Sequence, residues 1–581
     1  MKNANRYLLT LMLLLMTIFV IGKMLFIYYN QDVYNATGSA IWSIISNGLL
    51  LDLRTTALLL IIPTLTMMII RRGLRWVLVP YFCFIAFAMG AIIVADMVMY
   101  EFWEFKLCAV HLAYAASPEG TTNSVSTEFL VVRGLLIFAI TLAVAVPAIR
   151  ITPRHAKSRR HWMMPIAIVV LALLPIGVGN CYHHGPLFLS HAATNPMYRF
   201  AASFFDSNSF RNDGVKETDS IAVTRAYHTD DNITDTLLNT QRPNVLFVMM
   251  ESFGGKFVEE LGGIPGVAPN MSRLIPEGIF FDRYYSNSFR TDRGTVCAFS
   301  GWTSYPDISP MKEARMHTDL TSLSTSFRKA GYQTGYMYAG KMTNMGKYRY
   351  LADMGFESLM DDSYFKKEEL NTGWGANDST AAMKMYHTIA EIDSSARWMM
   401  VLQTISSHEP WDVPYQRLED KKLNAFAYTD QCVGDLVDSL RTLPVWDKLL
   451  VIIIPDHGFL YEQTYDNSEF FHSPMLWTGG AIKSSRRIHT LMNQSDIAAT
   501  LMAQMGQPTE EYMWSRNVFS PDYKPFVYCN YPAGILYKDE TGETMYDISA
   551  KRSLPIDEPV DDVRLQKGLQ ILRHSYNQLQ K

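Results

Sequence analysis

The sequence contains little cysteine, no excess of positive charge and no internal repeat. Its 581 residues carry a formal net charge of -4, which excludes the basic footprint of a nucleic-acid-binding protein. The six cysteines are far apart and include no Cys-x-x-Cys pair, so a dense disulfide framework is not expected. Most of them are expected to be small buried hydrophobic residues. The chain therefore has to be classified by its hydrophobic and polar patterns.

Long hydrophobic runs are confined to the first 181 residues. Five of them are long enough to cross a bilayer as helices, near residues 7–29, 48–70, 76–100, 129–149 and 162–181. A cleaved signal peptide would account only for the first, and that run is longer than the hydrophobic part of a usual signal peptide. The sequence therefore predicts a five-helix transmembrane domain, residues 1–181.

Basic residues predict the orientation of these helices, because cytoplasmic loops are enriched in Lys and Arg. Three basic clusters precede the first span, separate spans two and three, and separate spans four and five. They consist of Lys2 and Arg6, of Arg71, Arg72 and Arg75, and of Arg150, Arg154, Lys157, Arg159 and Arg160. The other two loops, 28–47 and 101–128, are poor in basic residues. We therefore expect a multi-pass protein of the plasma (inner) membrane, with its N-terminus inside and its C-terminal half outside.

One outer loop carries the aromatic sequence Phe102-Trp103-Glu104-Phe105-Lys106. Aromatic side chains are enriched where a membrane meets water. The segment fits a loop packed on the lipid headgroups, which is the simpler interpretation. It also fits an interfacial helix that contacts lipid or the outer domain.

The rest of the chain has the pattern of a soluble α/β domain. Residues 182–242 are expected to form a linker, with a polar and partly irregular stretch at 206–235. From residue 243 to residue 581, apolar strands alternate with helical patterns, which predicts an extracytoplasmic domain with a mainly parallel sheet covered by helices. The expected strands are 244–250, 333–338, 398–405 and 449–454, and the expected helices are 320–329, 379–392, 424–440 and 496–505.

Metal-ligand side chains follow two of these strands. Glu251 follows strand 244–250, and Asp456 and His457 follow strand 449–454 after Pro455. In open α/β sheets, ligands bind beyond the carboxyl ends of the strands, and a carboxylate beside an imidazole suits a divalent metal there. Either carboxylate alone could merely cap the next turn. The two together, each behind a hydrophobic strand, favour a metal site.

Two further histidines also lie downstream of strand ends. His408 follows strand 398–405, and His472 comes shortly after Asp456 and His457. A lone histidine is more often structural than functional. Three histidines in equivalent positions favour a shared site at one edge of the sheet.

A nucleophile is expected in the polar segment 288–295. Thr291 and Thr295 both carry hydroxyl groups, and a metal could activate either by lowering the hydroxyl pKa and neutralising the anion. Either threonine could instead be the N-cap of a following helix. The local sequence does not choose between them.

Together these motifs resemble the lipoteichoic acid synthase group of the alkaline phosphatase/sulfatase superfamily. The resemblance extends over nearly the whole chain, as five spans, a linker and an outer α/β domain. Its motifs are 244–252, Arg290-Thr291-Asp292, Ser407-His408 and Pro455-Asp456-His457-Gly458. It implies a sulfatase-type fold for the outer domain.

The resemblance also implies roles for individual residues. Thr291 becomes the nucleophile, His408 contacts the phosphate, and Arg290 beside the nucleophile could hold an anion. The related phosphoethanolamine transferases use two histidines at a second metal or substrate site, which His408 and His472 match, and Cys297 matches a cysteine of those enzymes. The implied metal ligands are Glu251, Thr291, Asp456 and His457.

Two departures limit the resemblance. The Trp and Arg that hold glycerol phosphate in lipoteichoic acid synthases align with Met345 and Lys347, so that pocket is not preserved as such. Lys347 could still pair with a phosphate as a point charge. The Cys-x-Pro-x-Arg signature of sulfatases is absent around Thr291, which argues against a standard sulfatase mechanism.

We therefore expect a membrane-anchored, metal-dependent phosphotransferase. It would move a phosphoglycerol or phosphoethanolamine headgroup from a phospholipid donor to an envelope glycan or glycolipid acceptor, through a phosphothreonine intermediate. The expected cofactor is one divalent ion, with Mn²⁺ favoured over Mg²⁺ or Zn²⁺, and a second ion near His408 and His472 is a further option. A phosphodiesterase or sulfatase-like hydrolase would use the same residues, and a non-catalytic envelope protein is the third alternative.

Overall fold

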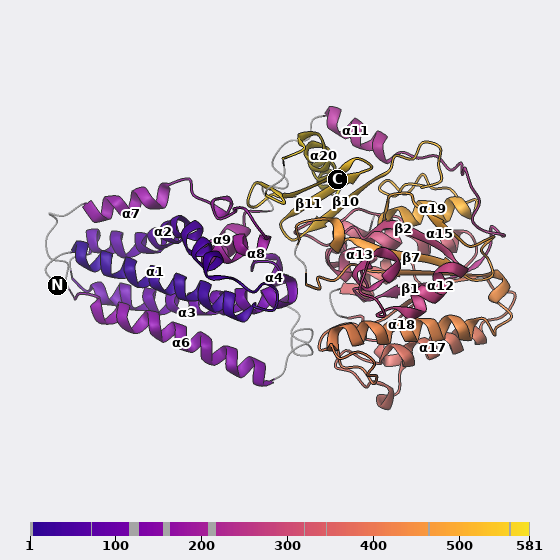
Figure 1. Ribbon diagram of the computed structural model, residues 1–581, viewed down its shortest axis with the longest axis horizontal. Coiled ribbons are helices and arrows are strands. Elements are labelled where there is room, and N and C mark those ends of the chain that lie inside the picture. Colours follow the sequence, from indigo (N-terminus) through magenta and orange to yellow (C-terminus); the bar gives the residue numbers. More distant parts are fainter. Residues whose placement is uncertain are drawn as a thin grey trace.

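The computed structural model describes residues 4–70, 72–115, 127–154, 163–206, 217–318, 320–343, 346–462, 465–556 and 559–579. A bundle of long helices forms one end of the molecule and an α/β domain forms the other (Figure 1). The N-terminus lies at the end of the bundle remote from the α/β domain (Figure 1). Several basic residues that predict the orientation lie outside the described residues, namely Lys2, Arg71, Lys157, Arg159 and Arg160.

Four helices of the bundle are long and apolar enough to cross a membrane: α1 (Ala4–Tyr29), α2 (Gly38–Ile69), α3 (Leu74–Trp103) and α6 (Thr127–Ile151). They bury a common hydrophobic core, while many other Leu, Ile and Phe side chains on their outer faces are exposed. A helix that is apolar on all sides is what a lipid environment requires. The chain is a multi-pass membrane protein.

The fifth predicted span, 162–181, differs in the structure. Its helix, α7 (Met163–Leu173), has only 11 residues, whereas a helical span needs roughly 20. Pro175 disfavours helical backbone at the residue before it, and Gly177 and Gly179 follow, so the helix ends early. α7 runs beside α2, and the chain then continues through short helical segments toward the α/β domain (Figure 1).

Short helices between α7 and β1 connect the bundle to the α/β domain. They are α8 (Leu187–Ala193), α9 (Pro196–Ser203) and α11 (Glu217–Tyr227), while another short helix, α4 (Val110–Ala115), lies between α3 and α6. At α9 the Asn195 side chain accepts a hydrogen bond from Tyr198 N, and Pro196 occupies the first helical position. The linker is therefore more helical than the sequence indicates. Within its polar stretch, residues 207–216 lie outside the described residues.

The α/β domain is built on a nine-stranded sheet in the order β4-β3-β5-β1-β6-β7-β2-β8, with β9 paired to β2. The strands from β4 to β6 in this order are parallel neighbours, whereas β7 is antiparallel to both β6 and β2. The sheet is therefore mixed and mainly parallel. The strands are β1 (Asn244–Met250), β2 (Ile279–Tyr285), β3 (Gln333–Tyr338), β4 (Ser358–Met360), β5 (Trp398–Gln403), β6 (Leu449–Pro455), β7 (His472–Thr478), β8 (Arg486–Ile488) and β9 (Met492–Asn493).

Helices cover the sheet, and each face of the sheet has its own hydrophobic core. Val245 and Phe247 of β1 belong to one core, and Leu246 and Val248 belong to the other. Successive side chains of a strand point to opposite faces, so a strand buried on both faces is apolar throughout. The expected strands and helices are all present, with small shifts at their ends. The helices are α12 (Pro269–Leu274), α13 (Thr291–Ser300), α14 (Ala314–His317), α15 (Leu323–Lys329), α16 (Lys347–Asp353), α17 (Asp378–Glu391), α18 (Lys421–Leu440) and α19 (Ile497–Gln504).

A second, antiparallel sheet near the C-terminus goes beyond the expected elements. It consists of β10 (Phe526–Tyr531), β11 (Gly534–Asp539), β12 (Gly542–Asp547) and β13 (Arg552–Leu554), and α20 (Asp562–Leu579) packs on it. Trp103 and Phe105, which follow the third membrane helix, share a buried cluster with Val527 and Tyr531 of this sheet. The second sheet is therefore part of the junction between the bundle and the α/β domain.

Candidate metal centre and active site

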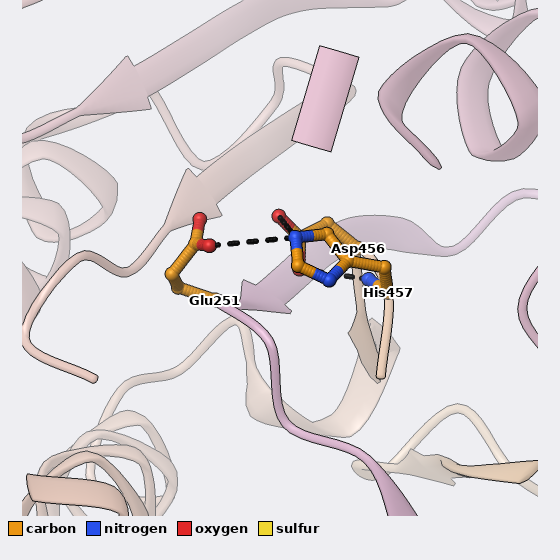
Figure 2. A group of neighbouring side chains, drawn as sticks. All are labelled: Glu251, Asp456 and His457. Atoms are coloured by element: carbon orange, nitrogen blue, oxygen red, sulfur yellow. Dashed lines mark hydrogen bonds and ion pairs between the residues drawn. The ribbon is translucent and has the colours of Figure 1, made fainter. Parts of the chain in front are cut away.

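Three side chains with metal-ligand chemistry meet beyond the carboxyl ends of β1 and β6. Met250 lies opposite Pro455 in the parallel pairing, so Glu251 and Asp456 leave the sheet at the same level. His457 Nε2 lies 3.6 Å from Glu251 Oε1 and 3.7 Å from Asp456 Oδ2. Figure 2 shows Glu251 and His457 turned toward each other, with Asp456 beside them. Ligand atoms of all three residues lie within 4.8 Å of one another.

Serine residues hold the two carboxylates in place. Ser252 N donates to Asp456 Oδ1 at 2.8 Å, and Ser252 Oγ donates to Glu251 Oε1 at 2.9 Å. Ser407 Oγ donates to the backbone oxygen of Glu251 at 2.6 Å. The φ angle of Ser252 is 57°, a left-handed conformation that costs a non-glycine residue on the order of 1 kcal/mol or more. This strained residue directs one donor to each carboxylate.

Thr291 reaches the same cluster from the start of α13. Its hydroxyl donates toward Glu251, at 3.4 Å from Oε1 and 3.3 Å from Oε2. Gly294 permits this approach, because a Cβ atom at that position would lie 1.9 Å from the backbone oxygen of Asp456. Arg290 is the N-cap residue of α13, so neither Thr291 nor Thr295 caps it. Thr295 is fully buried in the second turn of the helix.

The buried carboxylates have opposite pKa shifts. Burial and the negative charge of Glu251 raise the pKa of Asp456 to about 6. Burial also acts to raise the pKa of Glu251, but the hydrogen bond and charge of His457 outweigh it and hold that pKa below its usual range. Burial lowers the pKa of His457, while Asp456 and Glu251 raise it, and the net shift is upward. All three shifts show that the cluster favours a positive charge between its carboxylates.

This donor set fits a divalent metal ion. Asp456 Oδ2 is buried and has no hydrogen-bond partner among the residues that the structure describes, which leaves it available as a ligand. His457 Nδ1 lies 2.6 Å from the backbone oxygen of Gly458, so in the neutral ring Nδ1 carries the proton and Nε2 presents its lone pair. Glu251, Asp456, His457 and the Thr291 hydroxyl offer oxygen and nitrogen donors that suit such an ion.

The sequence comparisons show which proteins the chain resembles. Residues 243–507 match the sulfatase family. Over 491 residues the chain is 18% identical to lipoteichoic acid synthase 2 of Bacillus subtilis, covering 76% of this chain and 74% of that protein. Over 308 residues it is 21% identical to phosphoglycerol transferase I of Xanthomonas campestris pv. campestris. That match covers 49% of this chain and 44% of the relative, so the chain spans less than half of the relative's length.

Two solved structures share the fold of the α/β domain. An alkaline phosphatase superfamily protein from Vibrio parahaemolyticus superposes with a TM-score of 0.56 at 21% identity, covering 64% of this chain and 98% of that one. The lipoteichoic acid synthase LtaP from Listeria monocytogenes gives a TM-score of 0.53 at 15% identity, covering 62% and 98%. The chain is thus similar to lipoteichoic acid synthases over most of its length, and residues 243–507 match the sulfatase family.

His408 and Arg290 line the same small cavity as Glu251 and His457, with a volume of about 40 Å³. His408 Nδ1 lies 2.9 Å from Glu409 Oε2. Burial lowers the pKa of His408, but the negative charge of Glu409 raises it more, and the net pKa is about 9. His408 is therefore protonated at neutral pH, so it and Arg290 give the cavity two positive charges.

His472 lies outside this group. Its Nε2 lies 2.8 Å from the backbone oxygen of Asp282, and its ring stacks on Tyr285 with centroids 5.0 Å apart. Burial lowers the pKa of His472. It is not among the described residues that line the cavity, and the structure does not pair it with His408. Its expected catalytic role and the expected second ion therefore stay predictions.

Lys347 is buried and engaged within the protein. Its Nζ donates to Gln403 Oε1 at 2.9 Å and lies 3.8 Å from the centre of the Tyr338 ring. Burial lowers the pKa of Lys347 to about 8, although the charges of Glu251 and Asp456 oppose the shift. The charge of Lys347 therefore interacts electrostatically with Glu251 and Asp456 within the protein interior. The contacts of its Nζ atom are with protein groups and give no geometric support for a contact with a phosphate. Met345, expected in the same pocket, lies outside the described residues.

Several cavity residues were not predicted as site residues from the sequence. Glu101 and Trp103 come from the end of α3, whereas Trp411 and Lys422 come from the segment after β5. The guanidinium carbon of Arg290 lies 3.6 Å from the centre of the Trp103 ring. Two interpretations of the aromatic segment 102–106 were open. In the structure this segment contacts the outer domain. Only the tertiary fold brings these residues together.

Proposed function

We propose that this protein is a membrane-anchored phosphotransferase that moves a phosphoglycerol headgroup from a membrane phospholipid to a hydroxyl-bearing envelope glycan or glycolipid. One observation carries the proposal: the Thr291 hydroxyl lies 3.3 Å from Glu251 Oε2 at the edge of the buried Glu251–Asp456–His457 cluster. Phosphoglycerol is favoured over phosphoethanolamine because the relatives are named as lipoteichoic acid synthase and phosphoglycerol transferase.

The reaction consists of two displacements at one phosphorus atom. Thr291 Oγ1 attacks the donor phosphate, the bond from phosphorus to the diacylglycerol oxygen breaks, and that oxygen takes up a proton. The acceptor hydroxyl then attacks the phosphothreonine, loses its proton and returns Thr291 as a free hydroxyl. A divalent ion held by Glu251, Asp456 and His457 would lower the pKa of the Thr291 hydroxyl and offset the charge of the phosphate.

Arg290 and His408 supply the positive charge that the phosphate needs. Both line the cavity that Glu251 and His457 also line. The protonated His408 can donate a hydrogen bond to a phosphate oxygen or give a proton to the leaving oxygen. Thr291 also sits at the N-terminus of α13, where the helix dipole stabilises negative charge. The same groups face the phosphate in both displacements, so one arrangement serves both steps.

A second cavity supports transfer over hydrolysis. It has a volume of about 540 Å³ and adjoins the first, because Trp411 lines both. Trp411 and Tyr415 offer aromatic surfaces, and Asn371, Gln416 and Glu419 offer hydrogen-bonding groups. Sugar hydroxyls pair with amide and carboxylate groups of this kind. A hydrolase uses water as acceptor and needs no such space, so we assign this cavity to the acceptor.

The proposed location is the outer face of the plasma membrane. The basic residues of the sequence predict that the N-terminus is cytoplasmic, and α7 together with the segment after it would make the fifth crossing. Reporter fusions after residues 40, 73, 115, 155 and 240 should then read outside, inside, outside, inside and outside. A fusion after residue 240 that reads inside would contradict both the topology and the envelope acceptor.

Product analysis tests the proposed reaction. The full-length protein is placed in vesicles of phosphatidylglycerol labelled in the headgroup, with Mn²⁺ and a glycolipid acceptor. We expect release of diacylglycerol, label on the acceptor and, before acceptor is added, an adduct with the mass of glycerol phosphate on Thr291. Free labelled glycerol phosphate in the presence of acceptor would establish the hydrolase instead. Unchanged diacylglycerol release by Thr291→Ala would reject the proposed nucleophile.

The metal is tested in the same assay. Three oxygen donors and a single imidazole suit Mn²⁺ or Mg²⁺, whereas additional nitrogen or sulfur ligands would suit Zn²⁺ better. We propose Mn²⁺ as the working ion. Activity should disappear with a chelator and return with Mn²⁺; restoration by Zn²⁺ alone would contradict this assignment.

A further inference from the structure

We propose that the outer end of membrane helix α3 is part of the active site: Trp103 positions Arg290, and Glu101 receives the free end of the donor headgroup. This inference rests on the proposed phosphotransfer, because it assigns residues that act on the donor of that reaction. It makes the membrane helices a specificity element as well as an anchor. The observations that carry it are the cavity lining, the Trp103–Arg290 contact and the hydrogen bonds that fix Glu101.

The cavity at the metal-ligand cluster is built from both halves of the molecule. Glu251, Arg290 and His408 line it from the α/β domain, and Glu101 and Trp103 line it from α3. The outer domain alone would therefore lack one wall of its own active site. Because α3 is a membrane-spanning helix by length and composition, this wall lies where a phospholipid headgroup would arrive.

Trp103 supports Arg290 through the face of its ring. The guanidinium carbon lies 3.6 Å from the ring centre, a cation–π contact that is strong when it is shielded from water. Trp103 is 8% exposed and is itself packed, with its ring centroid 4.3 Å from that of His111 and 6.5 Å from that of Phe289. A guanidinium on a long flexible side chain is held in one place by such a platform. Trp103 is thus a positioning residue for the group that faces the phosphate.

The segment that carries Trp103 is fixed to the membrane bundle. α3 ends at Trp103, and the C-cap residue Glu104 adopts a left-handed conformation and donates its backbone N–H to Tyr100 O at 2.8 Å. The chain then folds back: Leu107 N donates to Asp96 Oδ1 at 2.9 Å, and Lys106 forms a buried ion pair with Asp96. The platform for Arg290 is therefore rigid relative to α3.

Glu101 lines the cavity and is hydrogen-bonded to Tyr29 of a second membrane helix, which a third membrane helix supports. Tyr29 of α1 donates its hydroxyl to Glu101 Oε2 at 2.7 Å, and Arg133 of α6 donates to the Tyr29 hydroxyl at 2.6 Å. Glu101 remains exposed, so its carboxylate still has acceptor capacity. A carboxylate accepts hydrogen bonds from the hydroxyl groups of a glycerol headgroup or from an ammonium group. With the phosphate at Arg290, Glu101 is placed to select a headgroup that ends in hydrogen-bond donors.

The test for Trp103 uses the full-length protein in vesicles and a double-mutant cycle. Trp103→Leu should lower kcat for phosphatidylglycerol by on the order of 10²-fold, because a misplaced catalytic group costs about this much. Trp103→Phe keeps a ring face and should recover much of the loss. In the Arg290→Ala background, Trp103→Leu should have no further effect. Metal affinity should stay unchanged in each variant, since none of the metal ligands is altered.

A matched control and the contradicting results complete this test. Trp42→Leu makes the same change at a tryptophan of α2 that is 71% exposed, and activity should remain as in the wild type. Additive effects of Trp103→Leu and Arg290→Ala would overturn the positioning role, as would full activity of Trp103→Leu. If Trp103→Leu does not fold, the cycle is run with Trp103→Phe, and an additive result there also overturns the proposal.

Glu101 is tested by comparing donors. Glu101→Gln should raise KM for phosphatidylglycerol by roughly tenfold, the effect of losing about 1.4 kcal/mol of binding, with little change in kcat. A phosphatidyl donor whose headgroup ends in a methyl group should show no change in KM. An equal increase in KM for both donors would overturn the proposed contact between Glu101 and the headgroup. If the wild type hydrolyses its donor without transferring it, the proposed function fails, yet the same KM comparison still decides the role of Glu101.

Discussion

His408 and Glu409 form an ion pair at the edge of the active-site cavity, with Nδ1 and Oε2 2.9 Å apart. Burial opposes the charge on both residues. The partner's charge nevertheless raises the pKa of His408 to about 9 and lowers the pKa of Glu409 to about 2. Both members are therefore charged across the neutral range, and the imidazolium is available to a phosphate.

Glu409→Gln should make the enzyme sensitive to mildly alkaline pH. Without the carboxylate, the pKa of His408 should fall toward the ordinary value of about 6.5, so activity that needs the imidazolium should decline at lower pH than in the wild type. The profile of kcat/KM against pH with a soluble phosphodiester measures this shift. Glu511→Gln, at an exposed glutamate paired with Lys329, is the matched control and should leave the profile unchanged. A wild-type profile in Glu409→Gln would contradict the role of the pair.

The same ion pair predicts a pH dependence of stability. The pKa of His408 is higher in the folded protein than in the unfolded chain, so protonation favours folding. This contribution is complete below about pH 6.5 and disappears as the pH rises through about 9. His408→Gln should remove it, and turnover should fall by on the order of 10²-fold. A fall in stability without a loss of turnover would mean that His408 is only structural.

Asp456→Asn should abolish metal binding and still stabilise the metal-free protein near neutral pH. The folded pKa of Asp456 is about 6, above the unfolded value of about 3.9, so the wild type loses stability as the pH rises between these values. The amide is uncharged and its oxygen can still accept from Ser252 N. Without metal, the Tm of the variant should be higher than that of the wild type at pH 7.5, and the two Tm values should be similar at pH 4. Mn²⁺ should raise the Tm of the wild type only; a metal-dependent rise in the variant would place the site elsewhere.

Substitutions at the two threonines of α13 should separate nucleophile from scaffold. Thr291→Ala should lose both the covalent adduct and transfer, whereas Thr291→Ser retains a hydroxyl and should keep the adduct. Thr295→Ala should cost about 1 kcal/mol of stability, since it removes buried atoms, but should keep the adduct. Mass spectrometry of tryptic peptides after incubation with donor distinguishes the two. An adduct on Thr295 would overturn the assignment, although the metal cluster would stand.

His472→Gln should reduce stability and leave catalysis nearly intact. It loses the ring that stacks on Tyr285 and weakens the bond to the Asp282 backbone oxygen, which together should cost about 1–2 kcal/mol. His489→Gln, at a histidine whose side chain is 72% exposed and which also contacts Asp282, is the control. Thermal unfolding and kcat are measured side by side. A large loss of kcat at unchanged Tm would return His472 to the catalytic residues.

The centre of the site was predictable because two buried strands carry it. β1 and β6 are apolar on both faces, so their boundaries are sharp in the sequence, and the carboxyl ends of parallel strands meet at one edge. Glu251, Asp456 and His457 could therefore be placed together before their distances were known. The local sequence was not sufficient to identify Thr291, because it allowed Thr295 as the nucleophile equally well.

The remaining differences arise from tertiary structure that local patterns do not encode. His472 follows β6 closely in the chain, but it is the first residue of β7, and the pairing of β7 with β2 places it opposite Tyr285. Hydropathy alone extended the fifth span through Pro175, where the helix has already ended. Trp103 lies far from Arg290 in the sequence. An aromatic residue at the end of a membrane helix is as typical of a contact with lipid as of a contact with another domain.

The contact at Gly294 limits how far the backbone of Thr291 can move relative to Asp456. The backbone of α13 rests on the backbone oxygen of Asp456 with no side chain between them, since any Cβ atom there would lie 1.9 Å from that oxygen. A distance set by side chains would vary with rotamer changes on the picosecond-to-nanosecond timescale. The distance between the backbones of α13 and Asp456 changes only when the sheet itself moves. Thr291 can thus redirect its hydroxyl by side-chain rotation alone. Ions of different radius would be accommodated by turning the carboxylates, and the reach of the attacking oxygen would stay constant.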